Sequence, residues 1–149
     1  AKIRALQDIK KVHMSNPVYH LPMKLYFEDT DAMGIVYHAN YLKFFERART
    51  EWFRVAGLHH MELAKKGVGF VIRKADMEWL APLTLDDEIV ATAQVAKMGN
   101  ASVDLEQTVL KNGEIVCRAR ILMVCVDFKT KKPQPIPDDI RAIFTTTGN

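Results

Sequence analysis

The sequence predicts an α+β domain in which an antiparallel sheet wraps around one long helix. Two observations support this prediction. Residues 40–56 place apolar side chains at helical spacing, along one broad stripe. Residues 69–128 instead alternate in polarity or run apolar, in short segments that turn residues separate. With 149 residues, the chain has the length of one domain.

The first two elements flank an acidic loop. Residues 18–28, "VYHLPMKLYFE", contain strand-forming side chains, and Pro22 favours a place at the edge of the sheet. The long helix follows over residues 40–56, with Asn40 as its expected N-cap and Gly57 as the residue that ends it. We expect Phe45 and Trp52 in the core, and the full apolar stripe comprises Tyr41, Phe44, Phe45, Ala48, Trp52, Val55 and Ala56.

The remaining segments are mostly strands. The segment "HHMELAKKG" at residues 59–67 predicts a short helix, and Asn112-Gly113 is a strong hairpin signal. Residues 115–128 are apolar on both faces, which predicts a strand in the interior of the sheet. A meander of strands is expected at residues 69–80, 88–98, 102–110 and 115–128, with a terminal helical turn at residues 138–144.

Composition and charge exclude several classes of function. The formal charge of +3 and the pI near 8.9 are only mildly basic, and no dense run of Lys and Arg indicates a nucleic-acid platform. No segment is long and apolar enough to cross a membrane, and a cytoplasmic location is the expectation. Cys117 and Cys125 lie too far apart on one strand to bond each other, so we expect two small buried side chains.

The N-terminal segment is expected to lie outside the domain. The tripeptide "HMS" at residues 13–15 is typical of a cloning junction, and the residues before it have no apolar core of a secretory signal. We therefore expect residues 1–13 to be an expression leader or an N-terminal extension, and residues 14–149 to form the single domain.

The stretch "EDTDAMGIVYHANYLKFFERARTEW", residues 28–52, gathers acids, a glycine and a histidine just before the long helix. Turns and the helix dipole account for one or two of these acids, but not for the whole string. Its part "DTDAMGIVYHANYLKFFERAR" resembles the signature of the hotdog-fold acyl-CoA thioesterases of the 4-hydroxybenzoyl-CoA thioesterase family. It is most similar to the branch associated with the bacterial Tol-Pal system.

The resemblance implies a hotdog fold and the hydrolysis of acyl-CoA thioesters to free CoA and a carboxylic acid. The catalytic Asp of the family matches Asp31, which acts either as the nucleophile or as the general base. The position seven residues later matches His38, whose backbone N–H polarises the thioester carbonyl. In this branch the imidazole is also proposed to take part. The family needs no cofactor and no metal.

Other residues of the stretch have a structural explanation beside a functional one. Gly34 allows a tight backbone between the acid and the helix, and it leaves room for a substrate. Tyr37 and Asn40 are candidate substrate contacts, but packing also explains Tyr37, and helix capping is the leading explanation for Asn40. We expect Asp29 in solvent and Glu46 on an exposed or interface face.

The CoA phosphates require cations, which can be ordinary surface residues. The candidates lie on the later strands and in the loop "KTKK", and they are Arg73, Lys74, Lys97, Lys129, Lys131 and Lys132. The expected partners are an acyl-CoA substrate and a second copy of the chain, joined edge to edge as a dimer or paired again as a tetramer. In this family the site lies across the dimer interface. An acyl carrier protein is a further candidate partner.

Two other functions fit the same fold. A hotdog hydratase or dehydratase would also use an acid and a histidine, but it would release no free thiol. A module that binds acyl-CoA or an acyl carrier protein, and acts as a scaffold at the cell envelope, would bind its ligand without turnover.

Overall fold

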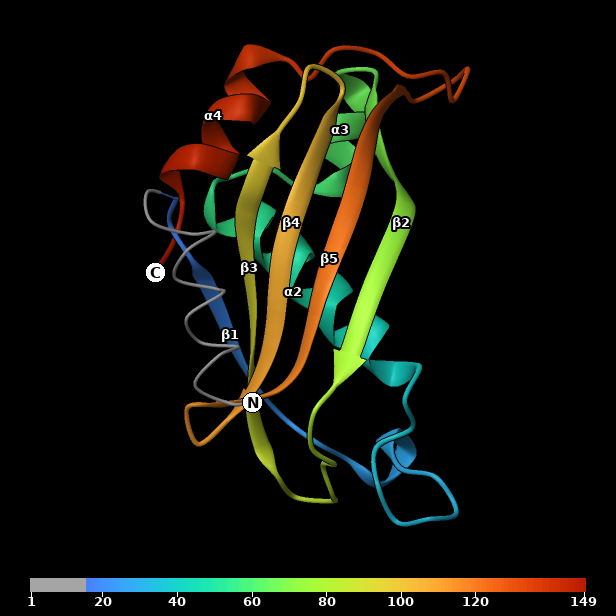
Figure 1. The fold of residues 1–149 in the computed structure, drawn as a ribbon. Helices are drawn as coiled ribbons and strands as arrows, with labels where there is room; N and C mark the ends of the chain where they lie inside the picture. Colours follow the sequence, from blue (N-terminus) through green and yellow to red (C-terminus); the bar gives the residue numbers. More distant parts are fainter. Residues whose placement is uncertain (1–15) are drawn as a thin grey trace.

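A computed structural model describes residues 16–149. The segment expected to be a leader, residues 1–13, lies outside the described residues. The described chain forms one five-stranded antiparallel sheet with the strand order β1-β3-β4-β5-β2, together with its helices (Figure 1). The elements are β1 (Tyr19–Lys24), η1 (Phe27–Asp29), α2 (Asn40–Val55), α3 (His60–Lys65), β2 (Val68–Trp79), β3 (Glu88–Met98), β4 (Ser102–Lys111), β5 (Glu114–Asp127) and α4 (Asp138–Thr146).

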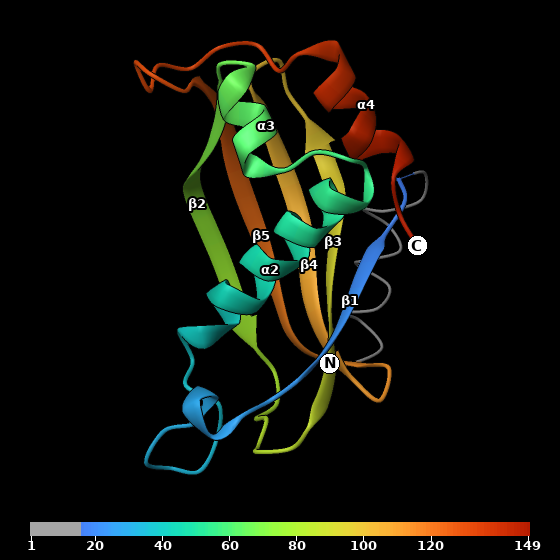
Figure 2. The same ribbon diagram turned by 180° about the vertical axis from the view of Figure 1, so that it is seen from behind.

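Helix α2 lies across one face of the sheet, which curves around it (Figure 2). Most of the stripe predicted from helical spacing is the buried side of this helix: Phe44, Phe45 and Ala48 have no exposed surface, and Trp52 is almost fully buried. The prediction is wrong for Val55, which lies in the last turn and is 58% exposed. Gly57 has a φ of +84°, a left-handed conformation that favours glycine after the last turn of a helix. The predicted extent of the helix and the residue that ends it are therefore confirmed.

One face of β4 packs against α2. Val103, Leu105 and Val109 are fully buried and belong to the core around α2, as expected from their shared face. The hairpin between β4 and β5 turns at Asn112 and Gly113, which have φ values of +51° and +77°. These two positions explain why the sequence signal for this hairpin is strong.

Strand β2 does not lie where a simple meander would place it. It pairs with β5, at the far edge of the sheet, whereas β3 pairs with β1 and β4. Residues 80–87 join β2 to β3 and span this distance along the end of the sheet (Figure 1). The expectation of a four-strand meander is therefore wrong for β2, while β5 is an interior strand as predicted.

The first strand is shorter than its sequence suggests. It ends at Lys24, and Phe27–Asp29 form a 3-10 turn that the sequence did not indicate. The turn is closed by Asp29, whose backbone N–H donates to the carbonyl of Tyr26 at 2.9 Å. The side chain of Asp29 accepts a hydrogen bond from the backbone N–H of Tyr26, also at 2.9 Å. These two bonds turn the chain away from the strand.

Both cysteines are free and buried on β5, as predicted. Burial raises the pKa of the Cys117 thiol to about 12, so this group stays protonated and unreactive at neutral pH. Helix α4 extends beyond the predicted turn and covers the C-terminal end of α2, where the rings of Phe144 and Trp52 meet edge-on at 5.5 Å. Among residues 16–149, no helix is long and apolar enough to span a membrane.

Candidate active site

The acidic loop between η1 and α2 holds Asp31 in a tight backbone turn. The Asp31 N–H donates to the carbonyl of Ile35, and the Gly34 N–H donates to the carbonyl of Asp31, both at 2.9 Å. One Asp31 carboxylate oxygen accepts the Met33 N–H at 2.8 Å. Gly34 has a φ of +77°, a conformation that side chains disfavour, so this turn requires its glycine. The turn presents a half-exposed carboxylate just ahead of the helix.

Two residues anchor this loop to the start of α2. Asn40 is 8% exposed, and its side-chain amide donates to the backbone carbonyl of Asp29 at 2.9 Å. The same carbonyl accepts the Tyr37 N–H at 3.0 Å. The loop therefore cannot move as a unit away from the helix without breaking buried hydrogen bonds.

These contacts correct two expectations. Asn40 is the first helical residue rather than the N-cap, and its side chain bonds to Asp29 instead of capping the helix. Asp29 is not a solvated acid, because it is only 7% exposed and its carboxylate bonds inside η1. The Asn40 amide bonds to a carbonyl eleven residues earlier, whereas the Asp29 carboxylate bonds to an N–H only three residues earlier, a local contact of the kind that turns use.

A second segment supports the loop from the side. The Val36 N–H donates to the carbonyl of Leu83 at 2.8 Å, and Ile35 forms an isolated bridge with Thr84. The turn that follows Leu83 is closed by Asp87, whose carboxylate accepts the Thr84 N–H at 2.8 Å. Asp87 thus holds the strip of backbone against which the Asp31 loop lies.

His38 lies exposed at the start of α2, within a group of aromatic rings. The imidazole lies 4.6 Å from the ring of Tyr37 and meets the ring of Trp79 edge-on at 5.9 Å. The Trp79 indole N–H donates to the backbone carbonyl of His38 at 3.2 Å. Within the described chain, no hydrogen bond or ion pair joins the side chains of Asp31 and His38. The sequence analysis missed Trp79, whose only signal was an aromatic residue near the end of a predicted strand.

The backbone at this point offers unpaired donors. Among the described residues, the N–H groups of His38 and Ala39 make no hydrogen bond, as is typical of a helix start. Beside them lies a mostly apolar hollow of about 260 Å³. It is lined by Ile35, Val36, His38, Tyr41, Trp79, Leu80, Ala81 and Pro82. The free N–H groups and the apolar hollow thus meet at the start of α2, and Asp31 lies on the preceding loop without lining the hollow.

A second hollow, of about 360 Å³, lies along the other half of α2. Its polar side comes from Glu46, Thr50 and His60: the Thr50 hydroxyl donates to the Glu46 carboxylate at 2.8 Å and lies 3.2 Å from the imidazole. Phe53 and Phe70 are among its apolar lining residues. Glu46 is exposed as predicted, and it faces this hollow rather than Asp31.

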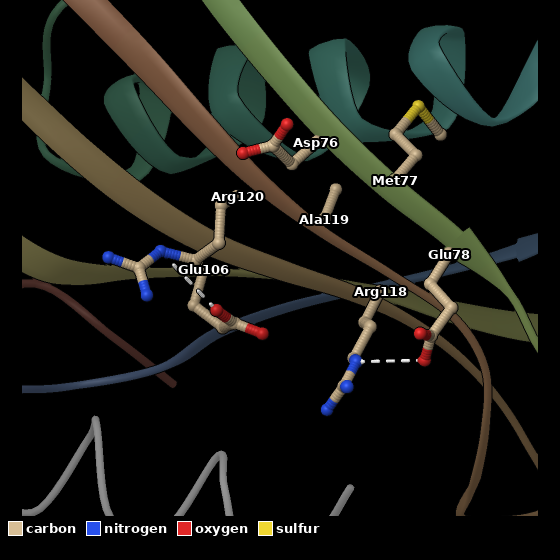
Figure 3. Close-up of a pocket in the computed structure, with 7 residues that line it drawn as sticks. All are labelled: Asp76, Met77, Glu78, Glu106, Arg118, Ala119 and Arg120. Carbon is tan, nitrogen blue, oxygen red and sulfur yellow. Dashed lines mark ion pairs between the residues drawn. The ribbon is translucent and has the colours of Figure 1, made fainter.

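A third hollow, of about 320 Å³, lies on the face of the sheet away from α2 (Figure 3). Arg118 pairs there with Glu78 at 3.2 Å, and Arg120 pairs with Glu106 at 3.6 Å. Because acids balance both arginines, this surface is not a cradle for phosphate groups. It lies on the opposite face from the Asp31 loop.

The candidate CoA-binding cations are not gathered in one place. Lys74 pairs with Asp76 at 3.4 Å on β2, and Lys131 lies 4.3 Å from the ring of Phe128. The loop that carries Lys131 lies at the end of the sheet opposite the Asp31 loop (Figure 1). Within residues 16–149, no three His, Cys, Asp or Glu side chains are grouped closely enough to hold a metal.

Comparison with known proteins places this arrangement in a family. A family model described as the thioesterase-like superfamily matches residues 25–144. The chain belongs to the thioesterase-like superfamily. It is 37% identical to the acyl-CoA thioester hydrolase YbgC of Escherichia coli O6:H1, over 88% of this chain and 98% of that protein. It is 34% identical to the acyl-CoA thioesterase YbgC of Haemophilus influenzae, over 85% and 93% of the two chains.

Solved structures agree with this superfamily assignment. A hypothetical protein from Aquifex aeolicus superposes with a TM-score of 0.80 at 26% identity, over 85% of this chain and 98% of that one. A gentisyl-coenzyme A thioesterase superposes with a TM-score of 0.75 at 31% identity, over the same shares of the two chains. The family resemblance and the hotdog fold predicted from the sequence are thereby confirmed.

The support of the loop by Asp87 predicts a dependence on pH. The hydrogen bond from Thr84 lowers the pKa of the Asp87 carboxyl, and Lys111, at 3.1 Å, lowers it further. Because the pKa of Asp87 is lower in the folded state, its ionised carboxylate stabilises the fold at pH values above the ordinary pKa near 4. This stabilisation is lost as the pH falls through the pKa that Asp87 has in the folded protein. Asp87→Asn should therefore lower the urea midpoint at pH 7, and the difference from wild type should shrink toward about pH 2.

The control is Asp86→Asn, which makes the same charge change at the exposed neighbouring residue. Asp86 has a φ of +70°, which asparagine tolerates. Urea unfolding of the three proteins at several pH values provides the measurement. A midpoint difference for Asp87→Asn that does not change between pH 7 and pH 2 would contradict the assigned role.

Proposed function

We propose that the protein hydrolyses acyl-CoA thioesters to free CoA and a carboxylic acid at the Asp31–His38 loop. The observation that carries the proposal is the placement of the Asp31 carboxylate directly before free N–H groups at the start of α2. Relatives that are 34–37% identical over most of their length are named as acyl-CoA thioesterases or thioester hydrolases. The chain is accordingly a thioesterase. What we propose beyond this is the role of each residue in the site.

Asp31 is the group that starts the reaction. As a general base it removes a proton from water, which adds to the thioester carbonyl carbon. As a nucleophile its carboxylate adds to that carbon itself, and water then hydrolyses the resulting anhydride. In both routes the C–S bond breaks, the thiolate takes up a proton, and the acid leaves with one oxygen atom from water. The half-exposed Asp31 carboxylate is accessible to a substrate.

The start of α2 stabilises the negative charge that develops on the carbonyl oxygen. Free N–H groups at a helix start donate hydrogen bonds, and the helix dipole adds positive potential there. In this proposal the N–H of His38 makes that bond, and the exposed His38 imidazole is the candidate that returns a proton to the leaving thiolate. Loss of one such donor typically lowers kcat by about 10²–10³.

Three neighbouring residues complete the proposed site. Gly34 gives a substrate access to the loop, since no atom lies within 4 Å of the position a side chain would take there. Tyr37 is 45% exposed beside His38 and can contact the bound thioester. Asn40 contributes indirectly, because its amide holds the Asp29 carbonyl. Their part in substrate binding stays a prediction.

The proposal includes a dimer joined at β2. In the described chain β2 pairs only with β5, and its side chains from Val71 to Trp79 are exposed apart from Met77. A long unprotected edge with exposed Val71 and Ile72 is a surface that pairs readily with another strand. Antiparallel pairing of two β2 strands about a two-fold axis would extend the sheet across both copies.

This dimer would place each site at the interface. Helix α2 starts beside the end of β2, where Trp79 meets His38, and it ends beside the start of β2, where Phe53 meets Phe70. A two-fold axis through the middle of β2 therefore brings the Asp31 loop of one copy beside the hollow that Glu46 lines in the other. The hollow is then available to the acyl group.

The direct test of Asp31 is thiol release from acyl-CoA substrates. We expect Asp31→Asn to lower kcat by about 10²–10⁴, because the amide is neither a base nor a nucleophile. Asp138→Asn, at an exposed residue of α4, makes the same change of charge and should keep full activity. Free thiol is measured with a chromogenic reagent over a panel of short-chain, long-chain and aroyl-CoA thioesters.

Each failure of that test has a distinct meaning. Equal turnover by wild type and Asp31→Asn would contradict the role of Asp31. Saturable binding of acyl-CoA by wild type without release of thiol would favour a binding module over an enzyme. Consumption of an unsaturated acyl-CoA without thiol would favour a hydratase.

The dimer is tested at its proposed edge. We expect sedimentation equilibrium to show at least a dimer for wild type, and a monomer with little activity for the double variant Val71→Asp, Ile72→Asp. The variant adds two acids to each of the paired strands, one of them opposite the acidic segment around Asp76 of β2, and like charges in cross-strand positions are destabilising. The control Val55→Asp adds an acid at an exposed residue of α2 and should stay oligomeric. A fully active wild-type monomer would contradict the proposed interface.

A further inference from the structure

Trp79, the last residue of β2, is tied to the start of α2 by three contacts. Its indole N–H donates to the His38 carbonyl at 3.2 Å. Its ring meets the rings of His38 and Tyr41 edge-on, with centroids 5.9 Å and 6.5 Å away. Trp79 is nevertheless 46% exposed, so burial of its surface does not by itself explain its position. The hydrogen bond is the most specific of the three contacts.

The carbonyl that Trp79 holds does not take part in the regular hydrogen bonding of the helix. His38 precedes Ala39, the N-cap of α2, so its carbonyl lies outside the series of helical hydrogen bonds. The Leu42 N–H donates to the carbonyl of Ala39, at 3.3 Å. Trp79 therefore supplies the hydrogen bond that the first turn of α2 does not supply.

This bond fixes the direction of a catalytically useful group. The His38 carbonyl and the Ala39 N–H belong to one planar trans peptide, so they point in opposite directions and turn together. Holding the carbonyl holds the N–H, and a hydrogen bond accepted by a carbonyl also polarises the N–H of the same peptide. Among the described residues the Ala39 N–H has no hydrogen-bond partner, so it is free to donate to a ligand.

We infer that Trp79 is a positioning residue for the thioesterase reaction, and that it acts by fixing the His38–Ala39 peptide, so that the Ala39 N–H donates to the developing oxyanion as a second donor beside the N–H of His38. The inference rests on the proposed function of this loop. Trp79 acts through the peptide and does not touch the reacting atoms. Because the oxyanion forms only in the transition state, loss of the indole N–H should lower kcat and leave KM nearly unchanged.

The experiment removes the donor while keeping the ring. Trp79→Phe keeps an aromatic side chain, and replacement of Trp79 by benzothienylalanine, in which sulfur takes the place of the N–H, keeps the full ring shape. We expect both to lower kcat by about 10–100-fold, the scale of a small misplacement of catalytic groups. KM should stay within about two-fold, as expected for an interaction made only in the transition state.

The matched control is Trp52→Phe. The Trp52 indole N–H also donates to a backbone carbonyl, that of Thr147 at 2.7 Å, but it lies in the core toward the other end of α2. This variant should unfold at a lower urea concentration and keep the kcat and KM of wild type. A loss of kcat in both tryptophan variants would indicate a general effect on the fold and would overturn the inference.

A second readout does not depend on turnover. In nuclear magnetic resonance spectra, loss of the hydrogen bond should shift the carbonyl carbon of His38 and the amide of Ala39 in the benzothienylalanine protein. Unchanged signals, unchanged kcat, or a raised KM at unchanged kcat would each overturn the inference. If wild type releases no thiol while these signals shift, the hydrogen bond is present and the proposed function is what fails.

Discussion

The structure around the proposed site depends on the buried hydrogen bonds between the acidic loop and the start of α2. The Asp29 carbonyl receives both the side-chain amide of Asn40 and the N–H of Tyr37. These bonds fix the end of the loop at the helix, while the turn at Gly34 fixes its middle. A carboxylate and a set of free N–H groups thus come from one short segment, with no large domain movement needed to assemble them. Such preorganisation is what makes hydrogen-bond donors effective in a transition state.

The rest of the fold keeps that segment in place. Helix α2 is held by its buried aromatic side, with Phe44 and Phe45 fully enclosed by the sheet. The strand β2 and the turn closed by Asp87 support the loop from two further sides. Trp79 and Asp87, which make these contacts, lie far from Asp31 along the chain. The geometry of the site therefore depends on the sheet topology as well as on the motif. The exposed edge of β2 is also where a second copy is proposed to bind beside the same loop.

The sequence predicted those features that depend on neighbours along the chain. The spacing of Phe44, Ala48 and Trp52 defined the helix, and Asn112-Gly113 defined a hairpin, because both signals are local. It did not predict the pairing of β2 with β5, since strand pairing is set by contacts distant in sequence. Asp31 and His38 were found through their motif, and their catalytic roles remain part of the proposal.

Two of the residues that were misjudged, Asn40 and Trp79, share one physical cause. Asn40 was expected to cap the helix, and Asp29 was expected to face solvent. In the structure both are buried, and the side-chain amide of Asn40 donates to the backbone carbonyl of Asp29, eleven residues earlier. The contact of Trp79 with the start of α2 was not predicted, because its hydrogen-bond partner, His38, lies forty-one residues earlier in the chain. Whereas the Asp29 carboxylate bonds locally, to the Tyr26 N–H, the Asn40 amide and the Trp79 indole each bond to a backbone carbonyl that only the folded chain brings within reach. Local propensity contains no information about such a bond.

The most direct test of the central claim is a crystal structure with an acyl-CoA analogue in which a methylene group replaces the thioester sulfur. In the proposed site, the ketone oxygen should lie about 2.7–3.1 Å from the backbone nitrogen of His38 or Ala39. An Asp31 carboxylate oxygen should approach from the preceding loop, to about 3–3.5 Å from the ketone carbon or with one water molecule between them. A ketone bound elsewhere, with the start of α2 left unoccupied, would contradict the assignment of this loop as the active site.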